Sequence, residues 1–244
     1  GFQLLMDVIL YFWTSGEIPE EFRFLRLKVL PKKGDLRAVG KWRGIFLMDT
    51  ACKLISKIVT TRLVNILKII GIEEQNGFMS GRGTTDGIFT LMQALRKRQE
   101  HSLDTWVAYI DLVKAFPSVP RNGLMLVLAK MGVPAALVEV IQRLHENIIA
   151  KFKLGKEEME IPNTSGTKQG DPLAAILFLF FIQACMETLN LKALEYRTGA
   201  EAKQMEFGVA GVRPNVKRGV VSFNIGYSLY ADDAGVLFGI ATHK

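Results

Sequence analysis

The sequence predicts a globular protein of the α+β class, with helices and strands mixed along one chain. Three observations support this prediction. The chain has 244 residues, enough for one large domain or two small ones. About half of the residues (49%) are hydrophobic, so a sizeable core can be buried. Segments with apolar residues at helical spacing alternate with segments in which they recur at every second position.

The first elements follow from this periodicity. Residues 2–13 have helical spacing and stop at a Ser-Gly breaker. Residues 22–30 alternate apolar and basic side chains, which predicts a strand with one solvated, positive face. A turn is expected over 31–35. Residues 50–70 predict a long amphipathic helix that ends at Gly71.

The middle of the chain is punctuated by glycine. The glycine-rich stretch from Gly77 to Gly87 leads into a helix that we expect to end near Glu100. Residues 105–111 predict a strand that ends in Asp111. The remaining predicted elements are helices over 121–131 and 135–147, a hairpin over 148–162, a buried helix over 173–189, irregular polar residues over 190–218, and strands over 220–230 and 234–240.

Charge is concentrated in one region. The net charge is +7, yet the stretch from Arg23 to Lys68 alone holds twelve Lys and Arg and only two acidic residues. A compact basic region favours a polyanion partner, and a solvated surface is the alternative. Two distant cysteines support neither a disulfide framework nor a zinc site. The three histidines are expected at the surface, and no segment is long enough to span a membrane.

Carboxylates stand where apolar strands end. Asp111 ends one predicted strand, and Asp232-Asp233 separates two others. Adjacent carboxylates repel each other, and a hard divalent cation such as Mg²⁺ would remove that cost. Two such ions about 3.5–4 Å apart can activate a hydroxyl nucleophile and stabilise a leaving pyrophosphate. The alternative is a plain turn, because Asp is common in tight hairpins.

Five segments carry a family resemblance. Tyr230-Ala231-Asp232-Asp233 resembles the YxDD box of reverse transcriptases. Residues 111–119 resemble the D-L-x-K-A-F-D-S-V motif of the non-LTR retrotransposon enzymes, and residues 166–173 resemble their G-x-x-Q-G-x-P-L motif. Residues 42–45 are similar to the fingers motif Y/W-R-P-I, and residues 75–86 to Q-x-G-F-x-x-G-R-x-x-x-D. The motifs occur in the family's order over nearly the whole chain.

The resemblance implies a right-hand polymerase fold. Residues 1–104 would form fingers and N-terminal helices. Residues 105–244 would form the palm, with fingers contributions around 120–170. A small antiparallel palm sheet, backed by helices, would carry the two acidic segments side by side, and the helical thumb is expected to be absent. The implied activity is RNA-directed DNA polymerisation with an RNA template, a DNA primer and dNTPs. A nuclear, intracellular location follows by the same analogy.

The resemblance also assigns the metal site. Asp111 and Asp232 would bind two Mg²⁺ ions, for which Mn²⁺ could substitute. Asp233 would be a supporting carboxylate, and the carbonyl of Leu112 would complete one metal shell. All three aspartates would be catalytic.

Other matched positions would bind the nucleotide. Phe116 would act as a steric gate against the 2′-hydroxyl, with a core phenylalanine as the alternative. Gln169 would lie beside the nucleotide, and Gly170 would permit close backbone approach. Arg43 would hold the triphosphate through its planar guanidinium.

Basic and aromatic residues complete the implied contacts. Lys32 or Lys33 would add positive charge near the triphosphate, unless they form a solvated basic turn. Arg82 would contact the template backbone, with a surface salt bridge as the alternative. Tyr230 would contact nucleic acid.

Three positions depart from the family pattern. Pro117 stands where the family usually has Asp, and it is expected to hold Phe116 out of the helical region. Gly44 replaces a proline after Arg43, and Asp171 would put a fourth carboxylate near the site. Two alternatives therefore stay open: an inactive retroelement remnant that binds RNA, and a reverse transcriptase/maturase of the group II intron type.

Overall fold

The computed structural model describes residues 1–188, 205–207, 221–223 and 227–239. The chain divides into two compact units, and each is built from separate stretches. Unit 1 comprises Gly1–Gly71 and Lys114–Ala184, and unit 2 comprises Ile72–Val113 and Cys185–Lys244. The assignment of fingers to residues 1–104 and palm to 105–244 stays a prediction.

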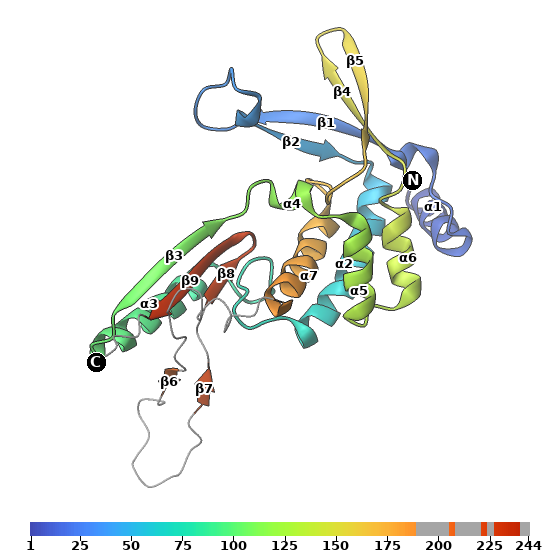
Figure 1. Cartoon of the computed structure of the whole chain (residues 1–244). Coiled ribbons are helices and arrows are strands. Elements are labelled where there is room, and N and C mark those ends of the chain that lie inside the picture. Colours follow the sequence, from blue (N-terminus) through green and yellow to red (C-terminus); the bar gives the residue numbers. More distant parts are fainter. Residues whose placement is uncertain (189–204, 208–220, 224–226, 240–244) are drawn as a thin grey trace. The chain divides into compact units, whose positions relative to one another are not determined.

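Unit 1 contains a four-stranded sheet of order β2-β1-β4-β5 (Figure 1). Its strands are β1 (Phe24–Pro31), β2 (Trp42–Leu47), β4 (Ile148–Leu154) and β5 (Glu157–Asn163). β1 pairs antiparallel with β2 and parallel with β4. β4 and β5 form the expected hairpin around Gly155, whose φ of 64° suits a tight turn.

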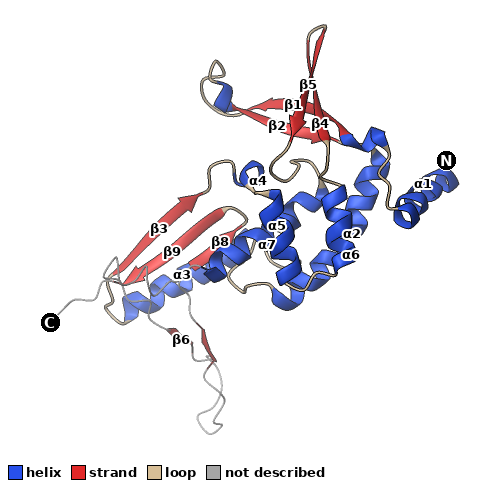
Figure 2. Cartoon of the chain, turned by 45° about the vertical axis from the view of Figure 1, so that its right-hand side comes forward, coloured by secondary structure: helices blue, strands red, loops and turns tan. Residues whose placement is uncertain are grey.

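Helices make up the rest of unit 1. They are α1 (Phe2–Ser15), α2 (Thr50–Ile70), α4 (Ala115–Ser118), α5 (Arg121–Lys130), α6 (Ala135–Arg143), α7 (Pro172–Thr188, whose last turn passes into unit 2), and the 3₁₀ turns η1 (Glu20–Arg23) and η2 (Val39–Lys41). α2 buries Ile55, Val59 and Leu63 at successive four-residue steps, as an amphipathic helix does. α7 is apolar around most of its circumference and lies among the other helices, as Figure 2 shows. Gln183 of α7 donates a hydrogen bond to the carbonyl of Ile70, at 2.7 Å.

Unit 2 contains an antiparallel sheet of order β3-β9-β8 and one long helix. Its elements are α3 (Thr84–Glu100), β3 (Thr105–Asp111), β8 (Tyr227–Tyr230), β9 (Asp233–Gly239), and a short pair of strands, β6 (Met205–Phe207) and β7 (Val221–Phe223). Ala94 of α3 and Leu237 of β9 are buried together, with Val107 of β3 packed against them. The expected helix-backed antiparallel sheet is therefore confirmed.

Several predicted elements differ from the observed ones. β2 was not expected, and it forms through its antiparallel pairing with β1. α6 ends at Arg143, four residues before the predicted end. The predicted strand over 220–230 is observed as β7 and β8, with residues 224–226 outside the described part. Most of the predicted irregular stretch over 190–218 also lies outside it. Within the described residues, no helix is both long and apolar enough to cross a membrane.

Candidate active site

Two carboxylates face each other at one end of the unit 2 sheet. β3 ends at Asp111 and β9 begins at Asp233, and the two residues are direct partners in the antiparallel ladder. Directly opposite residues point to the same face of a sheet, so the two side chains share one face. Tyr230 pairs with Asp233 across the β8–β9 hairpin, which leaves Ala231 and Asp232 as a two-residue turn. The acidic segments therefore lie side by side, as expected.

The Asp111–Asp233 pair has the donor chemistry of a divalent-cation site. Like charges directly opposite in a sheet are destabilising, and among the described residues neither carboxylate forms an ion pair. Hard cations such as Mg²⁺ prefer oxygen ligands of this kind. In the described part of the chain, no three His, Cys, Asp or Glu side chains gather closely enough to hold a metal. The structure thus pairs Asp111 with Asp233 and leaves Asp232 outside that pair.

Both paired carboxylates line one cavity of about 420 Å³. The sheet contributes its acidic end to this cavity, and the first turns of α3 contribute small and apolar side chains. Its other lining residues are Thr84, Gly87, Ile88, Leu91, Tyr109, Ile110, Ser228, Leu229, Tyr230, Ala234 and Gly235. The carboxylates therefore have an open space beside them within unit 2.

The turn between β8 and β9 has a strained backbone and is supported by the segment that precedes α3. Ala231 is buried and has a φ of 58°, a left-handed conformation that costs about 1–2 kcal/mol for an L-residue. The segment before α3 runs alongside it: the Leu229 N–H donates to Glu74 O, and the Asn76 N–H donates to Leu229 O, both at 2.9 Å. A Cβ on Gly77 would lie 2.3 Å from the nitrogen of Ala231. Glycine at position 77 is therefore required for this close contact.

The β1–β2 hairpin of unit 1 gathers the basic candidates. Lys32 and Lys33 occupy the turn after β1, and the Lys32 N–H donates to the carbonyl of Lys41 at 2.7 Å. Arg43 lies on β2, paired with Leu30 near the same end of the hairpin. The three basic candidates are exposed, which is what phosphate binding and a solvated basic turn both require.

Backbone hydrogen bonds join three motif segments within unit 1. The Phe46 N–H of β2 donates to the carbonyl of Gln169 at 2.7 Å. Gly170 has a φ of 109°, and a Cβ there would lie 2.4 Å from Phe46 O. The Thr167 N–H donates to the carbonyl of Phe116 at 2.9 Å. The loop containing Gln169 and Gly170 is thus tied to both β2 and the Phe116 segment.

Phe116 is half-buried and stacks on Phe178 of α7. The ring centroids are 4.8 Å apart, with an interplanar angle of 27°. The expectation that Pro117 holds Phe116 out of the helical region is wrong, because both residues lie in α4. Pro117 is tolerated there because the first turn of a helix leaves its N–H groups without partners. A Cβ on Gly166 would lie 2.5 Å from Pro117 Cα, so the adjoining loop packs directly against this turn.

Arg82 braces the segment before α3. Its guanidinium donates to the carbonyls of Ile72, Glu73 and Gln75 at 3.4, 2.8 and 3.2 Å, and it forms a 2.5 Å ion pair with Glu73. The salt-bridge alternative is therefore observed, and contact with a template stays a prediction. Tyr230 is 42% exposed at the end of β8.

Asp171 is engaged in structural contacts within unit 1. It is buried, and its Oδ2 lies 3.3 Å from the ammonium of buried Lys168. Its Oδ1 accepts a hydrogen bond from the Leu173 N–H at the start of α7, at 2.9 Å. The charge of Asp171 is therefore balanced by Lys168 within unit 1, and its place near the metal site stays a prediction.

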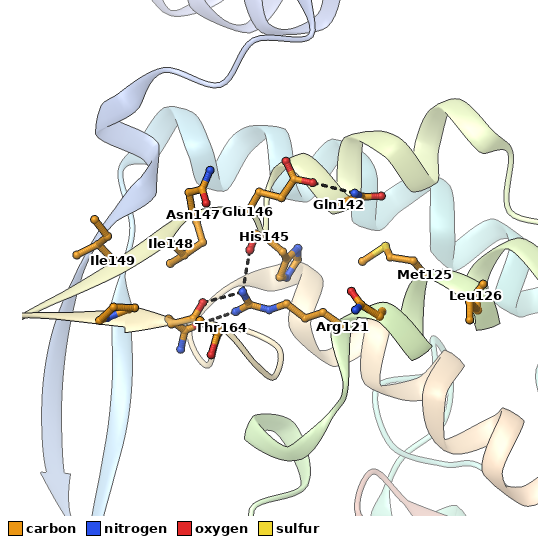
Figure 3. Close-up of a pocket in the computed structure, with 13 residues that line it drawn as sticks. Arg121, Met125, Leu126, Gln142, His145, Glu146, Asn147, Ile148, Ile149 and Thr164 are labelled. Carbon is orange, nitrogen blue, oxygen red and sulfur yellow. Dashed lines mark hydrogen bonds between the residues drawn. The ribbon is translucent and has the colours of Figure 1, made fainter.

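His145 was expected at the surface and is buried. Its Nδ1 lies 2.8 Å from the carbonyl of Ile141. Burial lowers the pKa of His145 well below its usual range, and the nearby charges of Lys168 and Arg121 lower it further. Figure 3 shows His145 lining a cavity of about 710 Å³ beside Arg121, which donates 2.7 Å hydrogen bonds to the carbonyls of His145 and Asn163.

Basic side chains share one face of the four-stranded sheet. The register places Arg26 beside Lys151 and opposite Leu47, and alternation along each strand extends this face. We call it the basic face; its members are Arg26, Lys28, Arg43, Lys151 and Lys153. Glu158 and Glu160 of β5 lie on the same face, and Glu160 forms a 2.9 Å ion pair with Lys151. The remaining basic groups are available to a polyanion.

Comparison with known proteins adds a family and a fold. The reverse transcriptase (RNA-dependent DNA polymerase) family matches residues 30–241. The Pol polyprotein of the retrotransposable element R2DM of Drosophila melanogaster is 27% identical over 186 residues, covering 76% of this chain and 17% of that protein. The transposon TX1 149 kDa protein of Xenopus laevis is 26% identical over 172 residues, covering 70% and 13%. The chain thus spans less than a fifth of either relative.

A solved structure shares the fold. The telomerase of Candida albicans, solved in complex with a fragment of telomeric RNA, aligns with a TM-score of 0.58. The alignment covers 97% of this chain and 40% of that one, at 10% sequence identity. At this identity the likeness shows the fold alone.

Proposed function

Because this chain belongs to the reverse transcriptase (RNA-dependent DNA polymerase) family, in the form found in non-LTR retrotransposons, we propose that it extends a DNA primer on an RNA template by two-metal nucleotidyl transfer. The observation that carries this proposal is the direct pairing of Asp111 with Asp233 at the end of the unit 2 sheet. The relatives are retrotransposon proteins, which favours this origin over a group II intron. A nuclear site of action is part of the proposal.

Each candidate residue has a physical task in this reaction. Asp111 and Asp232 would hold the two Mg²⁺ ions, or Mn²⁺ in their place, with Asp233 as a supporting carboxylate and the Leu112 carbonyl as a further oxygen ligand. The chemistry supplied by the bound ions is activation of the primer 3′-hydroxyl and stabilisation of the departing pyrophosphate.

Residues of unit 1 bind the dNTP in this proposal. Arg43 grips the triphosphate through two parallel hydrogen bonds, and Lys32 or Lys33 adds charge beside it. Phe116 excludes a 2′-hydroxyl, and Gln169 with Gly170 lines the nucleotide.

Nucleic acid is held by charge and by surface contacts. The basic face neutralises phosphates of the RNA template, and such contacts supply much of the affinity of proteins for nucleic acids. Tyr230 and Arg82 are the proposed contacts of unit 2.

Primer extension on an RNA template with Mg²⁺ and dNTPs tests the proposal. The full natural polypeptide containing these residues should extend the primer, and Asp111→Asn or Asp233→Asn should reduce the rate by roughly 100-fold or more, because metal-bound charge stabilisation amounts to several kcal/mol. Asp104→Asn is the matched control, since Asp104 immediately precedes the opposite end of β3. It should leave extension unchanged.

Two outcomes would count against the proposal. A folded, RNA-binding protein that extends no primer would indicate the inactive remnant. Extension that survives both Asp111→Asn and Asp233→Asn would place the metal site elsewhere.

A further inference from the structure

A buried glutamine holds the turn that carries Asp232 and Asp233. Gln75 is 4% exposed and precedes α3. Its Oε1 accepts hydrogen bonds from the N–H groups of Gly77 and Ala231, at 2.7 and 2.9 Å. Its Nε2 donates to the carbonyl of Ala231 at 3.4 Å. One side chain therefore satisfies both backbone groups of the residue between Tyr230 and Asp232.

These bonds matter because they add to the support that the β8–β9 hairpin gives to the conformation of Ala231. Its φ of 58° is one that alanine rarely adopts, so the surrounding structure must impose it. A buried N–H also needs an acceptor, and Gln75 supplies one from a position 156 residues away in sequence. Because glycine has no Cβ, the backbone at Gly77 can lie directly against the backbone of Ala231.

We propose that Gln75 is a positioning residue for the catalytic metal site, acting through the backbone of Ala231. It fixes the turn so that Asp233 begins β9 directly opposite Asp111. The inference rests on the proposed function for its catalytic consequence. Groups that orient metal ligands typically change metal affinity or activity by about 10- to 100-fold when they are lost.

The neighbouring residue provides a matched comparison. Asn76 is also buried, and its amide donates to the carbonyls of Glu74 and Leu229, at 3.2 and 3.4 Å. Those bonds hold β8 rather than the turn. Removing either amide disturbs the same segment, but of these two side chains only that of Gln75 forms hydrogen bonds with Ala231.

The test compares Gln75→Leu, Gln75→Glu and Asn76→Leu in the full natural polypeptide. Leucine keeps the approximate size of the side chain and removes its polar atoms, whereas glutamate keeps the acceptor that Gly77 and Ala231 share. Hydrogen exchange of the backbone amides in residues 229–233, measured without metal, reports the turn directly. The Mg²⁺ concentration for half-maximal primer extension reports the metal site.

We expect Gln75→Leu to speed exchange in the turn and to raise the required Mg²⁺ concentration by about 10- to 100-fold. Gln75→Glu should recover part of both effects, and Asn76→Leu should leave the Mg²⁺ requirement unchanged. If Gln75→Leu does not fold, Gln75→Asn replaces it, because its amide is one methylene too short to reach Ala231.

The outcomes separate this inference from the proposed function. Unchanged exchange in the turn or an unchanged Mg²⁺ requirement in the Gln75→Leu or Gln75→Asn protein would overturn the positioning role. If Asn76→Leu changes the exchange rate and the Mg²⁺ requirement as much as Gln75→Leu does, then Gln75 has only a structural role and no specific positioning role. If the unmodified protein extends no primer, the proposed function fails, and hydrogen exchange alone decides whether Gln75 holds the turn.

Discussion

The burial of His145 near two cations should make the stability of unit 1 depend on pH. The pKa of His145 is held well below its usual range by burial, then by Lys168 and Arg121, so the folded protein keeps this ring neutral. The unfolded chain takes up a proton as the pH falls below about 6.5. Between the two pKa values the unfolded state binds more protons. In that pH range, His145 should lower the free energy of unfolding by about 1.4 kcal/mol for each unit by which the pH falls.

Urea unfolding between pH 7.5 and 5 measures this dependence. His145→Gln removes the titrating ring and should flatten the curve in that window, even if it lowers stability at neutral pH. His101→Gln is the matched control, because His101 is exposed. The explanation fails if His145→Gln and His101→Gln give the same pH dependence.

The junction between β2 and the loop before α7 depends on a close backbone approach at Gly170. Its φ is 109°, and a Cβ would lie 2.4 Å from the carbonyl oxygen of Phe46. Gly170→Ala should lower the free energy of unfolding by about 2–4 kcal/mol, since backbone strain and a steric conflict with a strand add together. Equilibrium unfolding in urea measures this change.

Gly132 offers a control that separates the two causes. Its φ is 82°, yet a Cβ there would meet nothing within 4 Å. Gly132→Ala should therefore cost only the strain of a left-handed alanine, about 1–2 kcal/mol. Equal losses at both positions would show that the contact with β2 contributes little.

Helices and strands could be predicted where periodicity and turn residues within the segment itself determine them. The helix over 50–70, the end of α3 at Glu100, the β4–β5 hairpin and the strand that ends in Asp111 all follow from periodicity and turn residues. The start of α3 at Thr84 does not, because the glycine-rich stretch is expected to continue to Gly87. β2 was not predicted, because its six residues are ordered by pairing with β1. Sequence neighbours alone do not reveal such long-range pairing.

The same distinction between local and long-range signals applies to the residues of the candidate active site. The family resemblance implies that Asp111 and the turn around Asp233 lie side by side, and the structure confirms it. The support from Gln75 was not expected, because it spans 156 positions. The burial of His145 does have a local signal in the sequence, because His145 continues the four-residue spacing of buried Leu137 and Ile141.

For the molecule as a whole, net positive charge predicts salt-sensitive RNA binding. The net charge is +7, and several basic groups share the basic face of unit 1. Affinity for single-stranded RNA should fall as salt rises, and each lost phosphate contact should reduce the slope of log K against log salt by about 0.7.

Fluorescence anisotropy with a labelled RNA oligonucleotide, measured across a salt series, checks this prediction. The double change Arg26→Ala with Lys28→Ala should make the slope shallower by roughly 1.4 if both contact phosphates. Lys130→Ala, an exposed lysine at the end of α5, should not alter it. An unchanged slope in the double variant would exclude the basic face as the binding surface.

Each unit is built from two separate stretches of the chain, and this affects the order in which the units can fold during translation. All of unit 1 has been synthesised by residue 184, but β3 must wait for β9, its sole partner among the described strands. Asp111 and Asp233 are 122 positions apart, a delay of about 6–24 s at ordinary rates of translation. During that interval the nascent chain carries an unpaired strand with Trp106, Tyr109 and Ile110, the kind of edge that invites intermolecular pairing. The speed of translation across residues 112–233 should therefore determine how long β3 stays unpaired and able to pair with another chain.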